Sequence, residues 1–217
     1  MRRASRAFAL AFGIGILLLL CIGALERRTE AFTLGVEPTG PASLPRGEEI
    51  CQRPIEVSAG FSRIYLEPGS ERGPAAAFDV RVRRLPSGRQ LAEGGFPGGY
   101  EGRRTAVITV GDVRAGSRIS VCIRNAGVRP LQVYGSSGLS NPSSAAHYRG
   151  EAIDFDLALV FLRSDDASLL SLTNDIIARA SLFRGAWVGA WAGWLILALL
   201  LTAFPLLLFR ALRDVER

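Results

Sequence analysis

Two uncharged, apolar runs near the ends of the chain constrain its fold more than any other feature. Residues 7–25 carry no charged side chain in 19 positions, and residues 185–209 carry none in 25. As helices these runs extend roughly 28 Å and roughly 37 Å, against a bilayer hydrocarbon core of about 30 Å. The pattern predicts two transmembrane helices, at 7–25 and 185–209, on either side of a polar middle region.

The first run also has features of a secretory signal peptide, because Arg2, Arg3 and Arg6 precede it. Its apolar stretch is longer than the usual signal core of about 7–15 residues. The best small-residue cleavage site, at residues 22–24, begins with a bulky Ile22. A retained anchor is therefore favoured, and a cleaved signal stays as the alternative.

Basic residues near the two runs predict the orientation. Residues 1–6 and 210–217 supply six arginines, against four on the other side, at positions 27, 28, 179 and 184. Cytoplasmic segments carry the excess of basic residues, so both ends are expected in the cytoplasm and the middle region outside it. All 26 basic residues are Arg and none is Lys, a usage typical of a high-GC bacterial genome. We therefore expect an integral protein of a bacterial cell membrane.

Two of the three cysteines lie in the middle region. Cys51 and Cys122 are 71 positions apart, whereas Cys21 belongs to the first apolar run. In an oxidising compartment such a pair forms a disulfide. The sequence predicts that bond, with two buried free thiols as the alternative.

Short runs with strand character fill the region between residues 49 and 164, and turn residues separate them. Period-two alternation is clearest around Phe78, Val80 and Val82, and it indicates antiparallel sheet with one wet face. The predicted fold class is a mainly β extracytoplasmic domain, an antiparallel β-sandwich or jelly roll flanked by two transmembrane helices, with a small barrel as the alternative. The candidate strands are 50–57, 61–67, 77–85, 104–110, 117–124, 130–134 and 152–162.

The segments that flank this domain have different characters. Residues 26–48 are rich in Pro and Gly and are predicted to be a tether without regular structure. Residues 165–184 predict a membrane-proximal amphipathic helix, capped by Ser164 or Asp165. Pro54 places the first strand at a sheet edge or at a bulge, and the apolar end of 152–162 indicates a central strand.

Tryptophans and glycines recur at helical spacing in the second apolar run. Trp187, Trp191 and Trp194 share one face and are predicted anchors at the headgroup level. The glycines form a groove that a second helix can approach closely, and they are Gly185, Gly189 and Gly193. Genome composition, packing against residues 7–25, or contact with another membrane protein would each explain them.

Searches for catalytic, metal and cofactor motifs give no constellation. His147, the single histidine, lies in a Gly/Ser-rich stretch without a nucleophile elbow and is interpreted as a solvated loop residue. Asp154 and Asp156 share one face of a predicted strand, a weak indication of a cation site. We therefore expect no cofactor, no metal and no enzyme activity. Residues 26–184 hold 20 arginines against 18 acidic residues, a balance that argues against nucleic acid as a partner.

Two functional hypotheses follow. The first is an accessory or assembly partner of a larger envelope complex, with the bilayer and another integral membrane protein as partners. The alternative is a module that binds a cell-surface glycan or another envelope ligand, with Tyr100, Tyr134 and Tyr148 as candidate ligand contacts. An envelope-acting hydrolase comes third.

Overall fold

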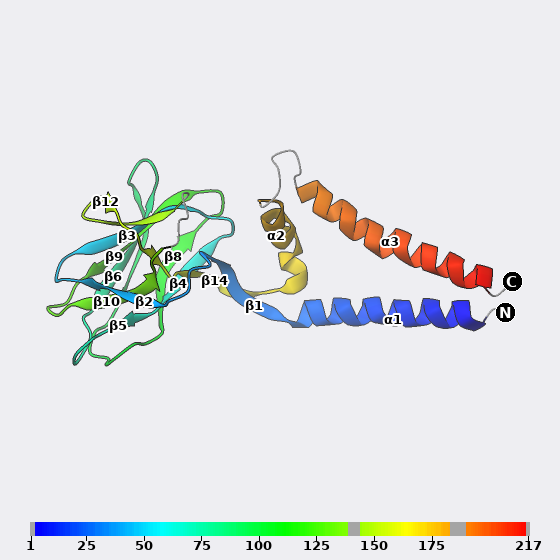
Figure 1. Cartoon of the computed structure of the whole chain (residues 1–217), viewed down its shortest axis with the longest axis horizontal. Coiled ribbons are helices and arrows are strands. Elements are labelled where there is room, and N and C mark those ends of the chain that lie inside the picture. Colours follow the sequence, from blue (N-terminus) through cyan, green and yellow to red (C-terminus); the bar gives the residue numbers. More distant parts are fainter. Residues whose placement is uncertain (1–2, 139–143, 183–189, 216–217) are drawn as a thin grey trace. The chain divides into compact units, whose positions relative to one another are not determined.

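The structure is a computed structural model that describes residues 3–138, 144–182 and 190–215. The described chain forms two compact units, a β-domain over Thr29–Asp165 and a helical unit formed by the segments on either side of it (Figure 1). The helices are α1 (Arg3–Leu25), α2 (Leu169–Leu182) and α3 (Ala190–Val215). The strands are β1 (Arg27–Thr33), β2 (Gly40–Leu44), β3 (Glu49–Glu56), β4 (Phe61–Leu66), β5 (Pro68–Gly69), β6 (Phe78–Arg84), β7 (Gln90–Phe96), β8 (Ala106–Val113), β9 (Arg118–Asn125), β10 (Leu131–Ser136), β11 (Ala145–Tyr148), β12 (Glu151–Ala152), β13 (Asp156–Leu157) and β14 (Val160–Ser168).

The strands of the β-domain form three sheets around one core. The largest has six strands in the order β12-β11-β3-β9-β6-β7. A four-stranded sheet has the order β1-β14-β4-β8, and in the third β10 lies between β13 and β2 and also pairs with β5. The pairs that strands β2 to β14 form with one another all run antiparallel. The predicted class, a mainly β antiparallel sandwich-like domain, is confirmed.

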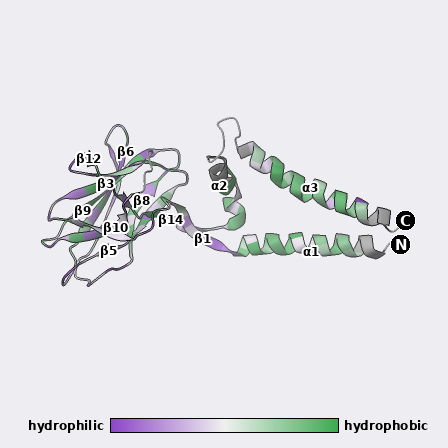
Figure 2. Ribbon diagram, in the orientation of Figure 1, coloured by the Kyte–Doolittle hydropathy of each residue, from purple (hydrophilic) through white to green (hydrophobic). Residues whose placement is uncertain are grey.

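Alternating side chains explain why these segments form half-buried strands. Phe78, Val80 and Val82 of β6 are at most 1% exposed, whereas Asp79 and Arg81 between them are only partly covered. The buried residues of the three sheets belong to one hydrophobic cluster. β6 therefore gives one face to the core and the other to its surroundings. Hydrophobic and hydrophilic residues are interspersed along the strands of the β-domain (Figure 2).

Aromatic packing joins the strands of the four-stranded sheet. Phe161 of β14 is fully buried and stacks on Phe32 of β1 at 4.3 Å between ring centroids. Phe61 of β4 meets the same ring edge-on at 4.7 Å. Pairs in these geometries stabilise a core beyond the area they bury.

Three sequence predictions about strands need correction. Residues 26–48 are not an unstructured tether, since they contain β1 and β2. Their partners β14 and β10 lie far along the chain, with Leu44 opposite Leu131, and so leave no local signal. β3 lies between β11 and β9 rather than at an edge, and Pro54 is accommodated by a register shift between Gln52 and Ile55. The bulge alternative was therefore correct.

The third correction concerns residues 152–162, which are not one central strand. They divide into β12, β13 and the start of β14, and these three pieces belong to three different sheets. Asp156, one of the apparently wet positions, is 5% exposed and accepts a hydrogen bond from Gln52 at 2.7 Å. The chain thus turns a corner of the sandwich where the sequence resembles a continuous strand.

The helical unit contains the predicted membrane-proximal helix, but that helix begins later than expected. β14 continues to Ser168, and α2 starts at Leu169. The Ser168 hydroxyl accepts a hydrogen bond from the Ser171 backbone N–H at 3.2 Å and so caps the helix in place of Ser164 or Asp165.

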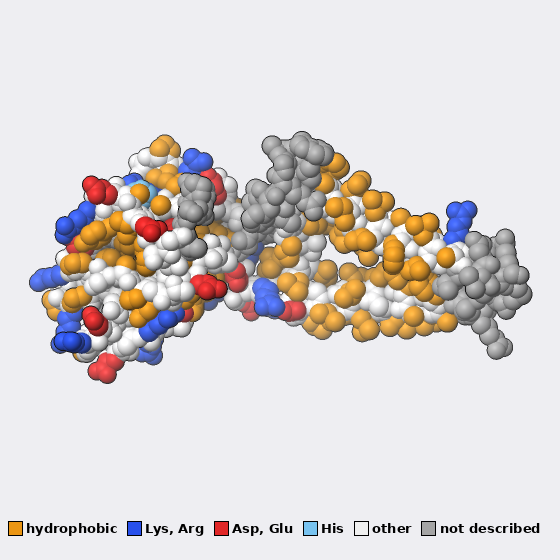
Figure 3. Space-filling view, in the orientation of Figure 1, with side chains coloured by type: hydrophobic (Ala, Val, Ile, Leu, Met, Phe, Trp, Pro, Cys, Tyr) orange, Lys and Arg blue, Asp and Glu red, His pale blue; other side chains and the backbone are white. Residues whose placement is uncertain are grey.

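One helix within the described residues is long and apolar enough to cross a bilayer. It is Trp191–Ala211 of α3, 21 residues that extend roughly 31 Å. The apolar part of α1, Leu10–Leu25, is shorter. Apolar side chains cover the drawn surfaces of both helices (Figure 3). One candidate span is therefore established by length and composition, and the second stays a prediction.

The glycine groove predicted in the second apolar run is described only at Gly193, because Gly185, Gly189 and Trp187 lie outside the described residues. A Cβ added at Gly193 would lie 2.7 Å from Cγ2 of Ile177 in α2. The close approach at this glycine is therefore made by a helix of the same chain, though not by residues 7–25 as the internal-packing interpretation expected. Trp191 and Trp194 are 59% and 44% exposed, and their role as interfacial anchors stays a prediction.

Paired glycines on neighbouring strands provide a test of how β10 and β13 pack in the β-domain. Gly135 of β10 is opposite Gly40 of β2. A Cβ at Gly135 would lie 2.0 Å from the carbonyl oxygen of Asp156, whereas one at Gly40 would meet nothing within 4 Å. We expect Gly135→Ala to lower the free energy of unfolding by about 1–3 kcal/mol through overpacking, and Gly40→Ala to change it by less than about 0.5 kcal/mol. Urea unfolding followed by circular dichroism measures both, and equal effects would contradict the packing described.

Candidate functional site

The outer face of the six-stranded sheet brings together side chains from strands far apart in the sequence. His147 of β11 is opposite Cys51 of β3, Cys51 is opposite Cys122 of β9, and Cys122 is opposite Arg81 of β6. Their chain neighbours Ala146, Gln52, Val121 and Val82 are buried in the core. By strand alternation this row therefore points away from the core.

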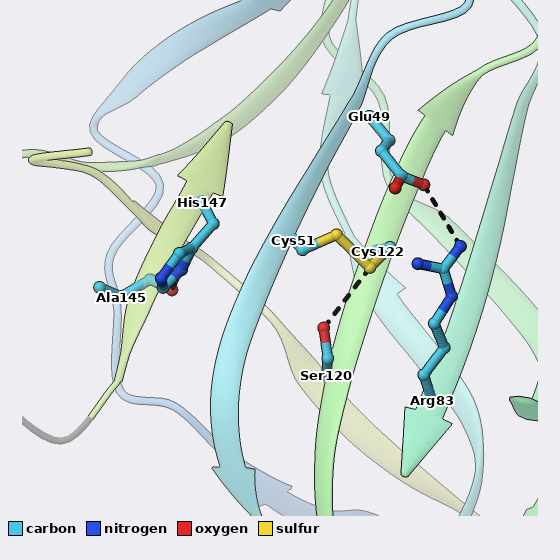
Figure 4. Close-up of a disulfide and its surroundings, with 7 residues drawn as sticks. All are labelled: Glu49, Cys51, Arg83, Ser120, Cys122, Ala145 and His147. Atoms are coloured by element: carbon cyan, nitrogen blue, oxygen red, sulfur yellow. Dashed lines mark hydrogen bonds and ion pairs between the residues drawn. A yellow bond between two sulfur atoms is a disulfide. The ribbon is translucent and has the colours of Figure 1, made fainter. Parts of the chain in front are cut away.

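The predicted disulfide forms the floor of this face (Figure 4). Cys51 and Cys122 are bonded across β3 and β9, with their Cα atoms 4.0 Å apart. Ser120 lies beside the bond, with its Oγ 3.5 Å from Sγ of Cys122. The crosslink joins the two central strands of the sheet. Charged side chains of these strands and of β6 surround it.

A cavity of about 640 Å³ lies over the disulfide. Leu85 and Pro86 supply an apolar part of its lining. Five arginines, two glutamates and the single histidine supply the ionisable part. These residues are Glu48, Glu49, Arg53, Arg81, Arg83, Arg124, His147 and Arg149.

Two ion pairs order part of this lining. Arg149 donates to Glu48 at 2.8 Å, and Arg83 of β6 reaches Glu49 of β3 at 3.6 Å across β9, beside the disulfide (Figure 4). The hydrogen bond from Arg149 lowers the pKa of Glu48 below its ordinary value, and the same bond raises the pKa of Arg149. These contacts are open to solvent, so they orient side chains more than they stabilise the fold.

Three arginines of the cavity have no such partner. The guanidinium groups of Arg53, Arg81 and Arg124 make no hydrogen bond or ion pair with any residue that the structure describes. Arg53 and Arg81 are half-buried. A guanidinium carries five N–H donors and is always charged, so these groups are available to an incoming ligand.

His147 is part of this site rather than a solvated loop residue. It lies on β11 and lines the cavity, and its Nδ1 is 3.0 Å from the carbonyl oxygen of Ala145. The sequence interpretation missed the strand because its partner, β3, lies more than 90 positions earlier in the chain.

Neither candidate cation site has the arrangement that a metal ion needs. Glu49, Cys51 and Cys122 offer ligand atoms within 4.8 Å of one another, but both sulfurs are used in the disulfide and thiolates are the ligands that metals bind. Asp154 accepts from the Gly138 backbone N–H, whereas Asp156 is turned into the core toward Gln52. The two aspartates therefore do not act together.

The three tyrosines proposed as ligand contacts do not line this cavity. Tyr100 is 7% exposed and packs on Phe96, and burial raises its pKa to about 12. Arg103 covers the Tyr134 ring at 4.4 Å, and Arg149 lies 5.3 Å from the centre of the Tyr148 ring. Of the three, Tyr148 is adjacent to the cavity, between His147 and Arg149 in the chain.

Comparison with known proteins gives a weak structural likeness only. No protein-family model matches the chain, and no curated protein matches it. Among solved structures, the β-domain is similar to CsCBM6-3 from Clostridium stercorarium in complex with cellobiose, at 17% identity and a TM-score of 0.32, over 52% of this chain and 95% of that one. It is also similar to a β-1,3-glucan-binding CBM6 from Bacillus halodurans, at 12% identity and a TM-score of 0.33, over 58% and 96%. Such TM-scores establish neither a shared site nor a shared ligand.

The disulfide yields a stability prediction. Replacing both Cys51 and Cys122 by Ser removes a crosslink over 71 positions, which corresponds to about 4 kcal/mol of unfolding free energy in the chain-entropy account. Thermal unfolding of the full chain in detergent is the measurement. Cys21→Ser, at the free cysteine, should unfold like the parent. A reductant should destabilise the parent and leave the double variant unchanged; if it shifts both equally, the disulfide is not the cause.

Proposed function

We propose that this chain is a membrane-anchored binding protein whose β-domain holds an envelope glycan on the outer face of the six-stranded sheet. The observation that carries the proposal is the cavity over the Cys51–Cys122 disulfide, with its arginines, glutamates and histidine. Six of these side chains come from β3, β6, β9 and β11, so the sheet holds most of the site in place. Glu48 and Arg149 lie just outside β3 and β11 and are held by their ion pair.

The chemistry of the cavity favours a ligand with many hydroxyl groups. Guanidinium groups donate hydrogen bonds and carboxylates accept them, so the Arg83–Glu49 pair offers both to a sugar ring. Hydrogen bonds to charged groups contribute about 1.5–3 kcal/mol each. Leu85 and Pro86 add apolar surface for the C–H groups of the ring. A few convergent polar groups beside apolar surface are typical of a ligand site.

The helices supply the anchor. Trp191–Ala211 of α3 has the length and apolarity of a bilayer span, and we propose that α1 supplies a second one. With both ends in the cytoplasm, as the arginine distribution favours, the β-domain stands outside the cell membrane, where envelope glycans are abundant. A disulfide-bonded domain suits that oxidising side.

The proposal is for binding without catalysis. The glutamates of the cavity face arginines at 2.8 Å and 3.6 Å, and the Arg149 contact lowers the pKa of Glu48. A carboxyl group used as a general acid needs a pKa raised toward the working pH, which is the opposite direction. We therefore assign these groups to recognition.

The accessory-subunit hypothesis has less support. It depended on a groove of glycines open to another membrane protein. At Gly193, Ile177 of α2 already makes the close approach within the same chain. The described part of the predicted groove is therefore already packed by a helix of the same chain. Ligand binding by the β-domain is the better proposal.

Removal of one ion pair tests the location of the site. Glu49→Ala with Arg83→Ala takes away a donor and an acceptor over the disulfide without changing net charge. We expect binding of the full chain to an envelope glycan extract, measured by biolayer interferometry, to fall about tenfold, the effect of one or two charged hydrogen bonds.

The matched control is Glu56→Ala with Arg118→Ala, a second ion pair of the same sheet, at 2.6 Å, that does not line the cavity. This variant should bind within about twofold of the parent. If both double variants bind like the parent, the cavity is not the glycan site.

Cysteine labelling tests the proposed topology. Val128 is 75% exposed in the β-domain. In a Cys21→Ser background, Val128→Cys should react with an impermeant maleimide in intact spheroplasts, whereas Ala211→Cys, at the far end of the α3 span, should react only after permeabilisation. The reverse pattern would place the β-domain in the cytoplasm and exclude an envelope ligand.

A further inference from the structure

Charge is concentrated at the cavity rather than spread over the β-domain. Thr29–Asp165 as a whole contains 16 arginines and 15 acidic residues. The cavity alone has five arginines against two glutamates, so the remainder of the domain is net acidic. A local excess of one sign in a cleft raises the concentration of the opposite charge there.

The unpaired arginines are placed to act together. Arg53, Arg124 and Arg81 lie on β3, β9 and β6, three strands that are neighbours in this order. Arg53 and Arg124 follow Cys51 and Cys122 by two positions on antiparallel strands, so they lie on opposite sides of the disulfide, and Arg81 is opposite Cys122. The three side chains therefore surround the disulfide, within the span of a ligand that carries several acidic groups. Each can take a carboxylate or a phosphate through two parallel N–H···O bonds.

Neighbouring carboxylates do not neutralise these arginines. Glu49 and Asp79 are opposite Arg124 on its two sides, and Glu93 is opposite Arg81. Glu49 lines the cavity, but its ion pair is with Arg83 at 3.6 Å. Asp79 and Glu93 do not line the cavity, and neither lies within ion-pair distance of those arginines in the part of the chain that the structure describes. Glu93 instead accepts a hydrogen bond from Gln90 at 2.7 Å.

The cavity has no aromatic platform on which a neutral sugar ring stacks. No Phe, Tyr or Trp is among its described lining residues, and the guanidinium of Arg149 lies over the nearby Tyr148 ring. Beyond the apolar surface of Leu85 and Pro86, affinity must therefore come from charge and hydrogen bonding. A neutral glycan offers hydroxyl oxygens as acceptors but no opposite charge, whereas hydrogen bonds from a guanidinium to a carboxylate or a phosphate are shorter and stronger.

We infer that the ligand is an anionic glycan, whose carboxylate or phosphate groups bind Arg53, Arg81 and Arg124 over the disulfide. This inference rests on the proposed function and names the chemical class of its ligand. Several acidic groups along one sugar chain can meet several arginines at once. Binding should therefore weaken steeply with salt, as screening shortens from about 10 Å at 0.1 M to about 3 Å at 1 M ionic strength.

The test compares probes that differ in charge alone. Full-length protein in nanodiscs of neutral lipid is titrated calorimetrically with an oligogalacturonate and with its methyl ester, which keeps the sugar and removes the carboxylates. A phosphorylated mannan and its unphosphorylated form make the same comparison for phosphate. We expect the charged member of at least one pair to bind ten or more times more tightly than its neutral counterpart. The pair that shows the difference identifies the acidic group.

Two variants locate that difference on the protein. Arg81→Gln with Arg124→Gln should reduce binding of the charged probe tenfold or more, since each arginine loses a charged hydrogen bond. Arg104→Gln with Arg114→Gln removes the same charge at exposed positions outside the cavity and should change binding less than twofold. Unchanged thermal unfolding of both variants shows that the fold is intact.

The outcomes separate this inference from the function on which it rests. Equal binding of charged and neutral probes overturns the anionic ligand and leaves glycan binding standing. Tighter binding of poly-glutamate than of any glycan overturns both in favour of an acidic peptide. Equal losses in the two double variants show that net charge, and not the arginines of the cavity, attracts the probe.

Discussion

Strand register is the constraint on which the candidate site depends. Along β6 the core residues Val80 and Val82 alternate with Arg81 and Arg83, and along β3 Ile50 alternates with Cys51. A slip of one residue would move arginines into the core and valines to the surface. Burial of the apolar side chains therefore also fixes which polar side chains lie on the outer face. The same hydrophobic effect that holds the sheet together places the guanidinium groups on its outer face.

A buried network of hydrogen bonds fixes the position of the strands at the corner of the sandwich. Gln52 of β3 is 1% exposed; it donates to Asp156 at 2.7 Å and accepts from the Leu157 backbone N–H at 3.0 Å. Buried polar groups are stable only when they are hydrogen-bonded. Gln52 thereby joins the six-stranded sheet to β13 of another sheet. Its chain neighbour Cys51 faces the other way and forms the floor of the site.

Local patterns predicted what depends on local sequence. The alternation at 77–85 gave β6, and the position of the cysteines gave the disulfide. β2 and β7 were not predicted because their sequences, GPASL and QLAEGGF, are rich in residues that strands usually avoid. Partners distant in the chain hold them in place, and a single sequence does not show those pairings.

Most of the site could not be predicted from the sequence, for the same reason. Twenty-six arginines are scattered along the chain, and nothing in their spacing says which of them share a face. The disulfide offered one usable signal. Once Cys51 is paired with Cys122, strand alternation places Arg53 and Arg124 on the same face. The contributions of Arg81 and His147 required the pairings of β6 and β11, which only the structure supplies.

The arrangement of the arginines also bears on how such a site works. Single exposed charges contribute little, commonly less than about 1 kcal/mol, so one guanidinium over an open cavity does not hold a ligand. Three of them on adjacent strands have backbone positions that the sheet fixes relative to one another before binding, so a ligand has only the side chains left to order. A polymer that carries repeated acidic groups gains most from this rigidity, because its contacts reinforce one another along the chain. For a domain held at a membrane, such modest but repeated contacts suffice to retain a polymer that is already nearby.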